Sequence, residues 1–320
     1  MLNQVLVPLD GSSLAECVLP HAVALAKAFD AQIMLVHVLE PPSASLRQPK
    51  ADPLDWYLKK STAKVYLDTV KAQLEENGLF VQAMLLEGRT TEQIVELAHA
   101  RKVDLLILSG YGESGANGGY ESGISSIVHQ ILQRVRVSTL IIRANQAAVP
   151  QTQNLHYQRL LVPLDGSQRA GAALTLAAAL ARAHDADLSL VHVVAKPEMP
   201  RRMPLNQEDT ELINRFVERN QEEGSKYLEQ VQNYLPANTQ TRLLVSDNVA
   251  ATLQRFSEQE QIDLLILSAH GYSGEAKWPY GSVTNRFITH GTTPLLIVQD
   301  LPPELAEVPY LGSETRQLAR

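Results

Sequence analysis

The sequence predicts an α/β fold: two tandem domains, each a doubly wound five-stranded parallel sheet. The first reason is duplication: Leu6–Ser12 reads LVPLDGS and returns as Leu161–Ser167, and LVHV and DLLILS recur in the same order. The second is that each copy alternates short runs of Val, Ile and Leu with longer helical stretches. Strands that are apolar throughout are typical of parallel sheets, which are buried on both faces.

The elements follow the same order in the two copies. We expect strands near 4–9, 32–39, 80–86, 103–109 and 138–143, and again near 159–164, 187–194, 239–245, 262–268 and 293–299. We expect helices at 14–28, 55–76 and 90–101, and again at 169–184, 206–233 and 249–260. The predicted domains are therefore 1–148 and 155–300, followed by a polar tail at 301–320.

Composition narrows the class of protein. The chain has 320 residues, enough for two domains of about 150 residues each. A net charge of -7 argues against nucleic acid or an anionic membrane as a partner. Cys17 is the single cysteine, so an internal disulfide is excluded, and no apolar run reaches the length of about 18 residues that a spanning helix needs. With no secretory pattern at the start of the chain, we expect a cytoplasmic protein.

The first strand of each copy ends in Pro-Leu-Asp-Gly-Ser, which brings Asp10 and Asp165 to the carboxyl edge of the predicted sheet. Ligands of open α/β sheets bind outside this edge, where the strand order reverses. The same three residue types also form turns and helix N-caps. A ligand site and a purely structural turn therefore both remain open for this motif taken alone.

The segment after the fourth strand of the second copy contains Gly271 and, after nine residues, Gly281-Ser282. A glycine-containing loop that enters a helix near Ser282 presents backbone N–H groups and a positive dipole end, which suits phosphate. The spacing is neither a Walker motif nor a dinucleotide fingerprint. Trp278 lies in this loop and would either cover a ligand or cap the domain.

On these residues, both halves resemble universal stress protein domains, over 2–143 and 158–299. The ATP-binding branch of that family has Gly-x-x-Gly, nine residues, then Gly-Ser or Gly-Thr, and the second copy departs only at Ser268. The resemblance implies an adenine nucleotide alpha hydrolase-like fold with strand order 3-2-1-4-5. It also implies ATP with Mg²⁺ or Mn²⁺, with Asp165 helping to place the metal. The implied nucleotide contacts are Pro163, Leu164, Asp165, Val193, Leu267, Ser268, His270, Gly271, Gly281, Ser282 and Val283.

The first copy departs further from this pattern. Tyr111 stands in place of His270, and no Gly-Ser follows after nine residues. Aligned backward from the fifth strand, Ser126-Ile127-Val128 falls opposite Gly281-Ser282-Val283, which leaves four extra residues in the first loop. A side chain at a crowded glycine and a longer loop should both weaken phosphate binding. We interpret His37 and His192, at the ends of the second strands, as packed, hydrogen-bonded core residues rather than metal ligands.

These observations favour a stress-response regulator that binds ATP mainly in its second domain and hydrolyses it slowly at most, because no positioned base or nucleophile is evident. A scaffold that binds partner proteins and no nucleotide is the first alternative, and an AMP-forming or flavin-type enzyme on a related fold is the second. The fifth strands, Thr139–Arg143 and Pro294–Val298, would each leave an unpaired sheet edge in a lone domain. We therefore expect the halves to pack edge to edge as a pseudo-two-fold dimer within one chain, and two chains to form a homodimer.

Overall fold

The computed structural model describes residues 2–41, 53–111, 124–143, 155–167, 169–197, 207–271 and 279–300. The first half contains β1 (Gln4–Pro8), α1 (Ser13–Glu16), α2 (Leu19–Phe29), β2 (Gln32–Leu39), α3 (Pro53–Glu75), β3 (Val81–Glu87), α4 (Thr90–Ala100), β4 (Leu105–Ser109), α5 (Ser126–Leu132) and β5 (Ser138–Ile142). The second contains β6 (Arg159–Leu164), α6 (Ala170–His184), β7 (Asp187–Ala195), α7 (Gln207–Gln232), β8 (Thr239–Ser246), α8 (Val249–Gln259), β9 (Leu264–Ser268), α9 (Ser282–His290) and β10 (Leu295–Val298). Residues 144–154 between the halves, the tail at 301–320 and Trp278 lie outside the described residues.

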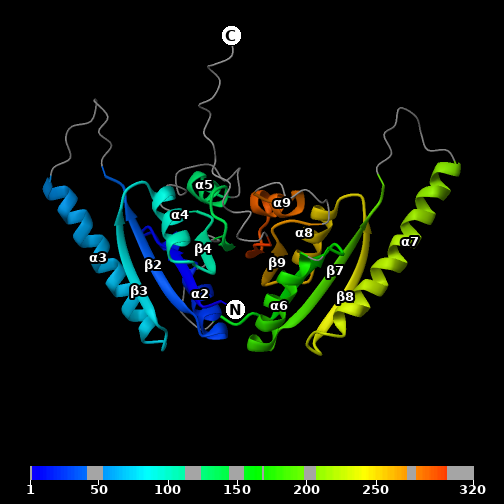
Figure 1. The fold of residues 1–320 in the computed structure, drawn as a ribbon, viewed down its shortest axis with the longest axis horizontal. Helices are drawn as coiled ribbons and strands as arrows, with labels where there is room; N and C mark the ends of the chain where they lie inside the picture. Colours follow the sequence, from blue (N-terminus) through cyan, green and yellow to red (C-terminus); the bar gives the residue numbers. More distant parts are fainter. Residues whose placement is uncertain are drawn as a thin grey trace, which may run out of the picture.

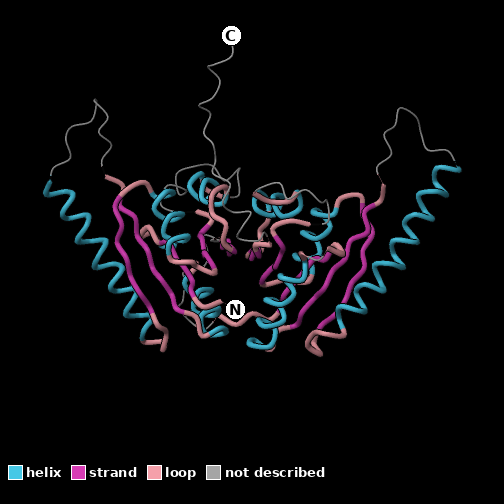
Figure 2. The backbone as a smooth tube through the Cα atoms, viewed as in Figure 1, coloured by secondary structure: helices cyan, strands magenta, loops and turns pink. Residues whose placement is uncertain are grey.

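The strands form one ten-stranded sheet in the order β3-β2-β1-β4-β5-β10-β9-β6-β7-β8. Each half therefore has the predicted order 3-2-1-4-5, and every strand pair within a half is parallel. Helices cover both faces of the sheet (Figures 1 and 2). The predicted doubly wound α/β fold is confirmed for both halves.

Successive side chains along a strand pack alternately into two separate hydrophobic cores, one on each face of the sheet. Val5 and Val7 pack into a core beneath α2, α3, α6 and α7, whereas Leu6 between them packs beneath α4, α5, α8 and α9. All three side chains are fully buried. The strands are apolar throughout because successive side chains point to opposite faces, and helices cover both.

The two halves meet where β5 pairs with β10 in antiparallel fashion. Leu140 lies opposite Leu296, its counterpart in the repeat, and both are fully buried. Equivalent residues face each other only across a two-fold axis, so the predicted edge-to-edge packing within one chain is confirmed. The guanidinium of Arg143, just after β5, also donates to the carbonyl oxygens of Phe287 and Ile288 in α9, at 2.9 and 2.6 Å.

One predicted helix is interrupted. The expected helix 14–28 is two helices: α1 ends at Glu16 and α2 begins at Leu19. Pro20 explains the break, because in a continuous helix its ring would clash with the carbonyl of residue 16 and it has no N–H to donate. At the second position of a new helix the missing N–H costs nothing.

Helices α3 and α7 are long and flank the molecule on its outer sides (Figure 1). The buried stripe of α3 is formed by Ala63, Leu67, Val70 and Leu74, and the rest of its surface is mostly polar and exposed. Among the helices in the described ranges, none has both the length and the apolar character required to cross a bilayer.

Candidate functional site

A cavity of about 400 Å³ opens at the carboxyl ends of β6, β7 and β9 in the second half. All eleven residues predicted to contact a nucleotide line it: Pro163, Leu164, Asp165, Val193, Leu267, Ser268, His270, Gly271, Gly281, Ser282 and Val283. The cavity lies at the reversal of strand order between β6 and β9, the usual ligand position in open α/β sheets. The structure thus brings the whole predicted set together.

The turn after β6 holds Asp165 in place. Its Oδ1 accepts a hydrogen bond of 3.0 Å from the backbone N–H of Ser167, and Gly166 between them has a φ of +81°. This is an Asx-type turn, which matches the structural interpretation of the motif. A Cβ added to Gly271 would collide with the Asp165 carboxylate. Glycine at 271 is therefore required by the close approach of the fourth-strand loop to this carboxylate.

Hydrogen bonds close the loop on both sides of the cavity. Ser268 Oγ donates to the carbonyl oxygen of His270 at 2.8 Å, and Thr284 Oγ1 donates to the carbonyl oxygen of Ser268 at 3.0 Å. The backbone N–H of Gly281 donates to Ala269 O at 2.9 Å. The departure from glycine at Ser268 is therefore accommodated, since its hydroxyl stabilises the loop from within.

Gly281 is the N-cap of α9 and, having no side chain, makes no capping hydrogen bond. The first turn of α9 lines the cavity through Ser282, Val283 and Thr284. The first N–H groups of a helix have no partner within the helix and carry its positive dipole end, so this turn can donate to an anion.

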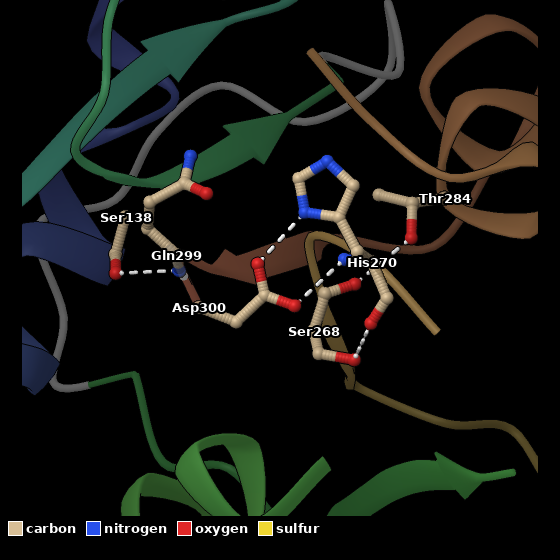
Figure 3. A network of polar contacts seen from close by, with 6 residues as sticks. All are labelled: Ser138, Ser268, His270, Thr284, Gln299 and Asp300. Carbon is tan, nitrogen blue, oxygen red and sulfur yellow. Dashed lines mark hydrogen bonds and ion pairs between the residues drawn. The ribbon is translucent and has the colours of Figure 1, made fainter. Parts of the chain in front are cut away.

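His270 is anchored by a residue that the sequence motif does not include. Its ring Nδ1 donates to Asp300 Oδ1 at 2.8 Å, and its backbone N–H donates to Asp300 Oδ2 at 3.1 Å (Figure 3). Both side chains are almost fully buried, at 3% and 1% exposure. The next residue back, Gln299, donates its N–H to Ser138 Oγ in the first half at 3.1 Å. The loop is thus tied through β10 to the seam between the halves.

The cavity also has walls that sequence reasoning missed: Val191, His192, Ala195, Val249, Leu253 and Thr284. Val249 and Leu253 come from α8, and an apolar wall of this kind suits a flat ring system. For Val249 and Leu253, the signal available in the sequence was the helix periodicity of 249–260. The ring Nδ1 of His192 donates to Leu164 O at 2.7 Å, which confirms the prediction of a hydrogen-bonded histidine there.

The equivalent cavity of the first half is smaller, at about 150 Å³, and is lined by Asp10, Ser109, Tyr111 and Ser125 among others. Ser125 is the N-cap of α5, and its Oγ accepts from Val128 N at 3.3 Å. The predicted alignment is one residue out: the caps make Ser125 the counterpart of Gly281, so the first loop has three extra residues, not four.

The reason given for the predicted weaker phosphate binding in the first half is also wrong in part. A Cβ added to Gly281 would meet protein atoms no closer than 3.6 Å, so this glycine is not crowded by the protein. The two helix ends also differ in capping: Ser125 accepts from an N–H of its own helix, whereas Gly281 provides no side-chain cap to α9.

A metal would have few protein ligands here. Within the described ranges, no group of three or more His, Cys, Asp or Glu side chains is arranged to hold a metal ion. Asp165 is the carboxylate in the cavity wall. One carboxylate suits Mg²⁺ that arrives with phosphate groups, because Mg²⁺ keeps several waters and is usually held by one or two carboxylates plus the phosphates.

Comparisons with known proteins agree with this architecture. The chain is 26% identical over 144 residues to universal stress protein MJ0531 of Methanocaldococcus jannaschii, covering 45% of this chain and 83% of that protein. It is 27% identical over 152 residues to universal stress protein YxiE of Bacillus subtilis, covering 45% of this chain and all of that protein.

Solved structures show the same fold over both halves. A universal stress protein of Archaeoglobus fulgidus matches with a TM-score of 0.64 and 16% identity, covering 93% of this chain and 99% of that one. Protein PA1789 of Pseudomonas aeruginosa matches with a TM-score of 0.67 and 12% identity, covering 95% and 94%. The model of the universal stress protein family matches twice, at residues 1–143 and 156–299. The chain therefore belongs to the universal stress protein family, with two copies of its domain in tandem.

Proposed function

We propose that this protein is a stress-response regulator that binds ATP in the cavity of its second half. The observation that supports this most directly is the uncapped N-terminus of α9 at Gly281, which lines a cavity together with Asp165 and Gly271. Phosphate groups would accept from the first turn of α9, and the adenine ring would pack on Val249 and Leu253. The resemblance to the ATP-binding branch gives the same nucleotide.

Hydrolysis is not expected to be the main activity. Among the described lining residues, those with ionisable side chains are Asp165, His192 and His270. His192 is bonded to a backbone carbonyl through Nδ1, and His270 to Asp300. Phosphoryl transfer depends on several aligned charged groups around the reacting phosphate, and these side chains do not form such a set. We therefore propose a binding switch with slow turnover at most.

The binding test is calorimetry on the full chain, because the halves share a seam and their cores. We expect one ATP per chain. Gly281→Val should lower the affinity for ATP at least about a hundredfold, since the branched side chain occupies the space proposed for the phosphates. The variant should still fold, because the nearest protein atoms leave room for an added Cβ. Gly171→Val is the matched control, because an added Cβ there meets nothing within 4 Å. Unchanged affinity in Gly281→Val, or two equal ATP sites per chain, would contradict the assignment.

The role of the metal is tested separately. With Mg²⁺ present, Asp165→Asn should lower the affinity for ATP about tenfold, because the carboxylate no longer helps to hold the cation. With EDTA in place of Mg²⁺, the variant should bind as well as the parent or better, since a negative charge near the phosphates has been removed. A loss of equal size in both buffers would show that Asp165 acts on the nucleotide and not through a metal.

The choice of nucleotide is tested by competition. One solved structure of a universal stress protein is a complex with cAMP, at 18% identity and a TM-score of 0.33 over 44% of this chain. Titrations with ATP, AMP and cAMP on the same protein separate these ligands. We expect ATP to bind most tightly, because only its terminal phosphates reach the α9 turn in full. Equal binding of all three would restrict the site to the adenosine part.

Assembly and location complete the proposal. We propose that two chains associate into a four-domain homodimer in the cytoplasm and that the bound nucleotide controls binding of a partner protein. Sedimentation over a range of concentrations tests the homodimer, and fractionation of cells tests the cytoplasmic location. A chain that sediments as a monomer at every concentration would remove the homodimer from the proposal.

A further inference from the structure

The first half contains a second, larger cavity that the nucleotide proposal does not use. It has a volume of about 800 Å³ and lies on the α3 side of the sheet, at the carboxyl ends of β1 and β2. The small cavity of the same half lies on the opposite side, since Val36 and Val38 line that one whereas His37 and Leu39 line this one. Side chains that alternate along β2 thus separate the two cavities.

Helices α3 and α7 carry different residues where they approach their sheets. Tyr66 meets His37 at 6.3 Å between ring centroids, and Tyr227 meets His192 at 6.4 Å, so Ala63 of α3 corresponds to Gly224 of α7. A Cβ added to Gly224 would lie 2.8 Å from the His192 ring.

Helix α7 therefore packs closer to its sheet than any residue with a side chain would allow at this position. Helix α3 has the methyl group of Ala63 at the corresponding position, so it cannot pack on its histidine in the same way. The cavity lies between the first turns of α3 and the end of β2.

The ionisable groups of the wall give it an excess of negative charge. Three charged residues line the cavity, all of them exposed: Asp10, which follows β1, and Asp55 and Lys59, which lie one helical turn apart on α3. Burial lowers the pKa of His37, which is therefore neutral at neutral pH. Burial and the nearby carboxylates of Glu16 and Asp10 raise the pKa of Tyr66, which also stays neutral. Among the described residues of the wall, two carboxylates and one ammonium group remain as charges.

The rest of the wall is aromatic and aliphatic. Two aromatic residues of α3 line the cavity: Trp56, half-buried near the start of the helix, and Tyr66, ten residues further along it. Leu39, at the end of β2, adds an aliphatic surface. Aromatic faces together with a carboxylate attract a cation that carries a ring: the ring packs on Trp56, and the charged nitrogen is attracted by both the carboxylate and the aromatic faces.

The second half does not repeat this set of side chains. In the register fixed by the two His–Tyr pairs, Asp55, Trp56 and Lys59 correspond to Phe216, Val217 and Asn220. The wall of the first half is thus particular to it and does not follow from the duplicated fold.

We propose that the cavity between α3 and the ends of β1 and β2 is a binding site for small organic cations that carry an aromatic ring, that is, aromatic amines. The amine lies toward Asp10, and the ring lies against Trp56 and Leu39. The site is independent of nucleotide binding in the second half.

The test uses the fluorescence of Trp56. The chain has two tryptophans, so Trp278→Phe leaves Trp56 as the single emitter, on the wall of the cavity. Three probes share one ring and differ in charge: 2-phenylethylamine, 2-phenylethanol and phenylacetate. We expect a saturable change in emission with the amine, at least about tenfold weaker binding of the alcohol, and no saturable change with phenylacetate.

Variants connect the effect to the charge of the wall. Asp10→Asn should reduce the affinity for the amine to that for the alcohol and leave the affinity for the alcohol unchanged. Asp165→Asn, the same change at the equivalent position of the second half, should change neither. Lys59→Asn copies the second half and should strengthen amine binding. Equal binding of all three probes, no saturable change with the amine, or a loss in Asp165→Asn equal to that in Asp10→Asn would overturn the proposal.

Discussion

The loops that follow β4 and β9 start alike and end differently. Both begin with a serine whose hydroxyl donates to the carbonyl oxygen two residues on, Ser109 to Tyr111 at 2.6 Å and Ser268 to His270 at 2.8 Å. They then reach a helix whose N-cap is Ser125 in one half and Gly281 in the other. The Ser125 side chain accepts a hydrogen bond from the first turn of α5, whereas Gly281 offers no side-chain cap to the first turn of α9.

This difference shows that the capacity to bind an anion and the stability of a helix end compete for the same N–H groups. A side-chain cap stabilises the first turn and removes a donor from the site. In the second half, the turn remains uncapped and the carboxylate of Asp165 lies beside the loop. The first turn of α9 is thus available to an anion, whereas the first turn of α5 is partly capped by its own serine.

The largest expected effect comes from opening the seam that joins the two halves. Leu296→Asp places a carboxylate in a fully buried position opposite Leu140, and we expect it to lower the free energy of unfolding by about 3–5 kcal/mol. Val65→Asp is the control, because Val65 is 63% exposed on α3, and it should change stability by less than about 0.5 kcal/mol. Urea unfolding of both variants measures the difference. If the two losses are similar, the seam does not hold the halves together.

A histidine near the seam distinguishes the halves in their response to acid. His21 in α2 accepts from the hydroxyl of Tyr157 at 2.9 Å, and burial lowers its pKa to about 4. The unfolded chain binds this proton below about pH 6.5, so the stability gained from neutral His21 is lost as pH falls from about 6.5 to 4. The loss is at most about 3 kcal/mol.

The check on this prediction copies the second half, where Leu176 takes the place of His21 in α6. His21→Leu combined with Tyr157→Phe removes both hydrogen-bonding partners together. The difference in the free energy of unfolding between pH 7 and pH 4.5 should be smaller in this double variant than in the parent, because the remaining histidines are common to both. An equal pH dependence would show that His21 is already solvated.

The smallest effect sharpens the comparison of the caps. Gly281→Ser gives α9 the cap of α5, and we expect ATP to bind about tenfold more weakly while stability changes by less than about 0.5 kcal/mol. The reciprocal Ser125→Gly should not create a second ATP site, because its cavity of about 150 Å³ is too small and its loop is longer. Calorimetry with ATP measures both. A second equivalent of bound ATP in Ser125→Gly would make the cap the sole difference between the halves.

The repeated apolar runs predicted the parallel sheets of both halves. The strand order was implied by the resemblance to universal stress protein domains, and the seam was predicted from that resemblance together with the apolar fifth strands. All eleven residues that the resemblance implied as nucleotide contacts lie in the wall of the cavity in the second half, but six other residues of that wall were missed. Pro20 was a signal for the break between α1 and α2 that the composition of the helix concealed. The loop count was one too high because an alignment from the fifth strand does not show which serine caps the helix.

Other features could not be predicted from the sequence. Asp300 is a single carboxylate after a strand, and only the three-dimensional structure brings it to His270. The cavity beside α3 is formed by residues after β1, at the end of β2 and on α3, which are far apart in the sequence. Arrangements of this kind arise from packing between distant segments, and local patterns do not contain them.

The seam between β5 and β10 lies within one chain, and this changes what a mutation does. In a symmetric pair of identical subunits, every substitution appears twice, once on each side of the axis. Here a single gene duplication has placed both sides in one polypeptide, so Gly281 and Ser125, or Ala63 and Gly224, vary independently. The partner domain that keeps the sheet edge covered is always present, whatever either half comes to bind.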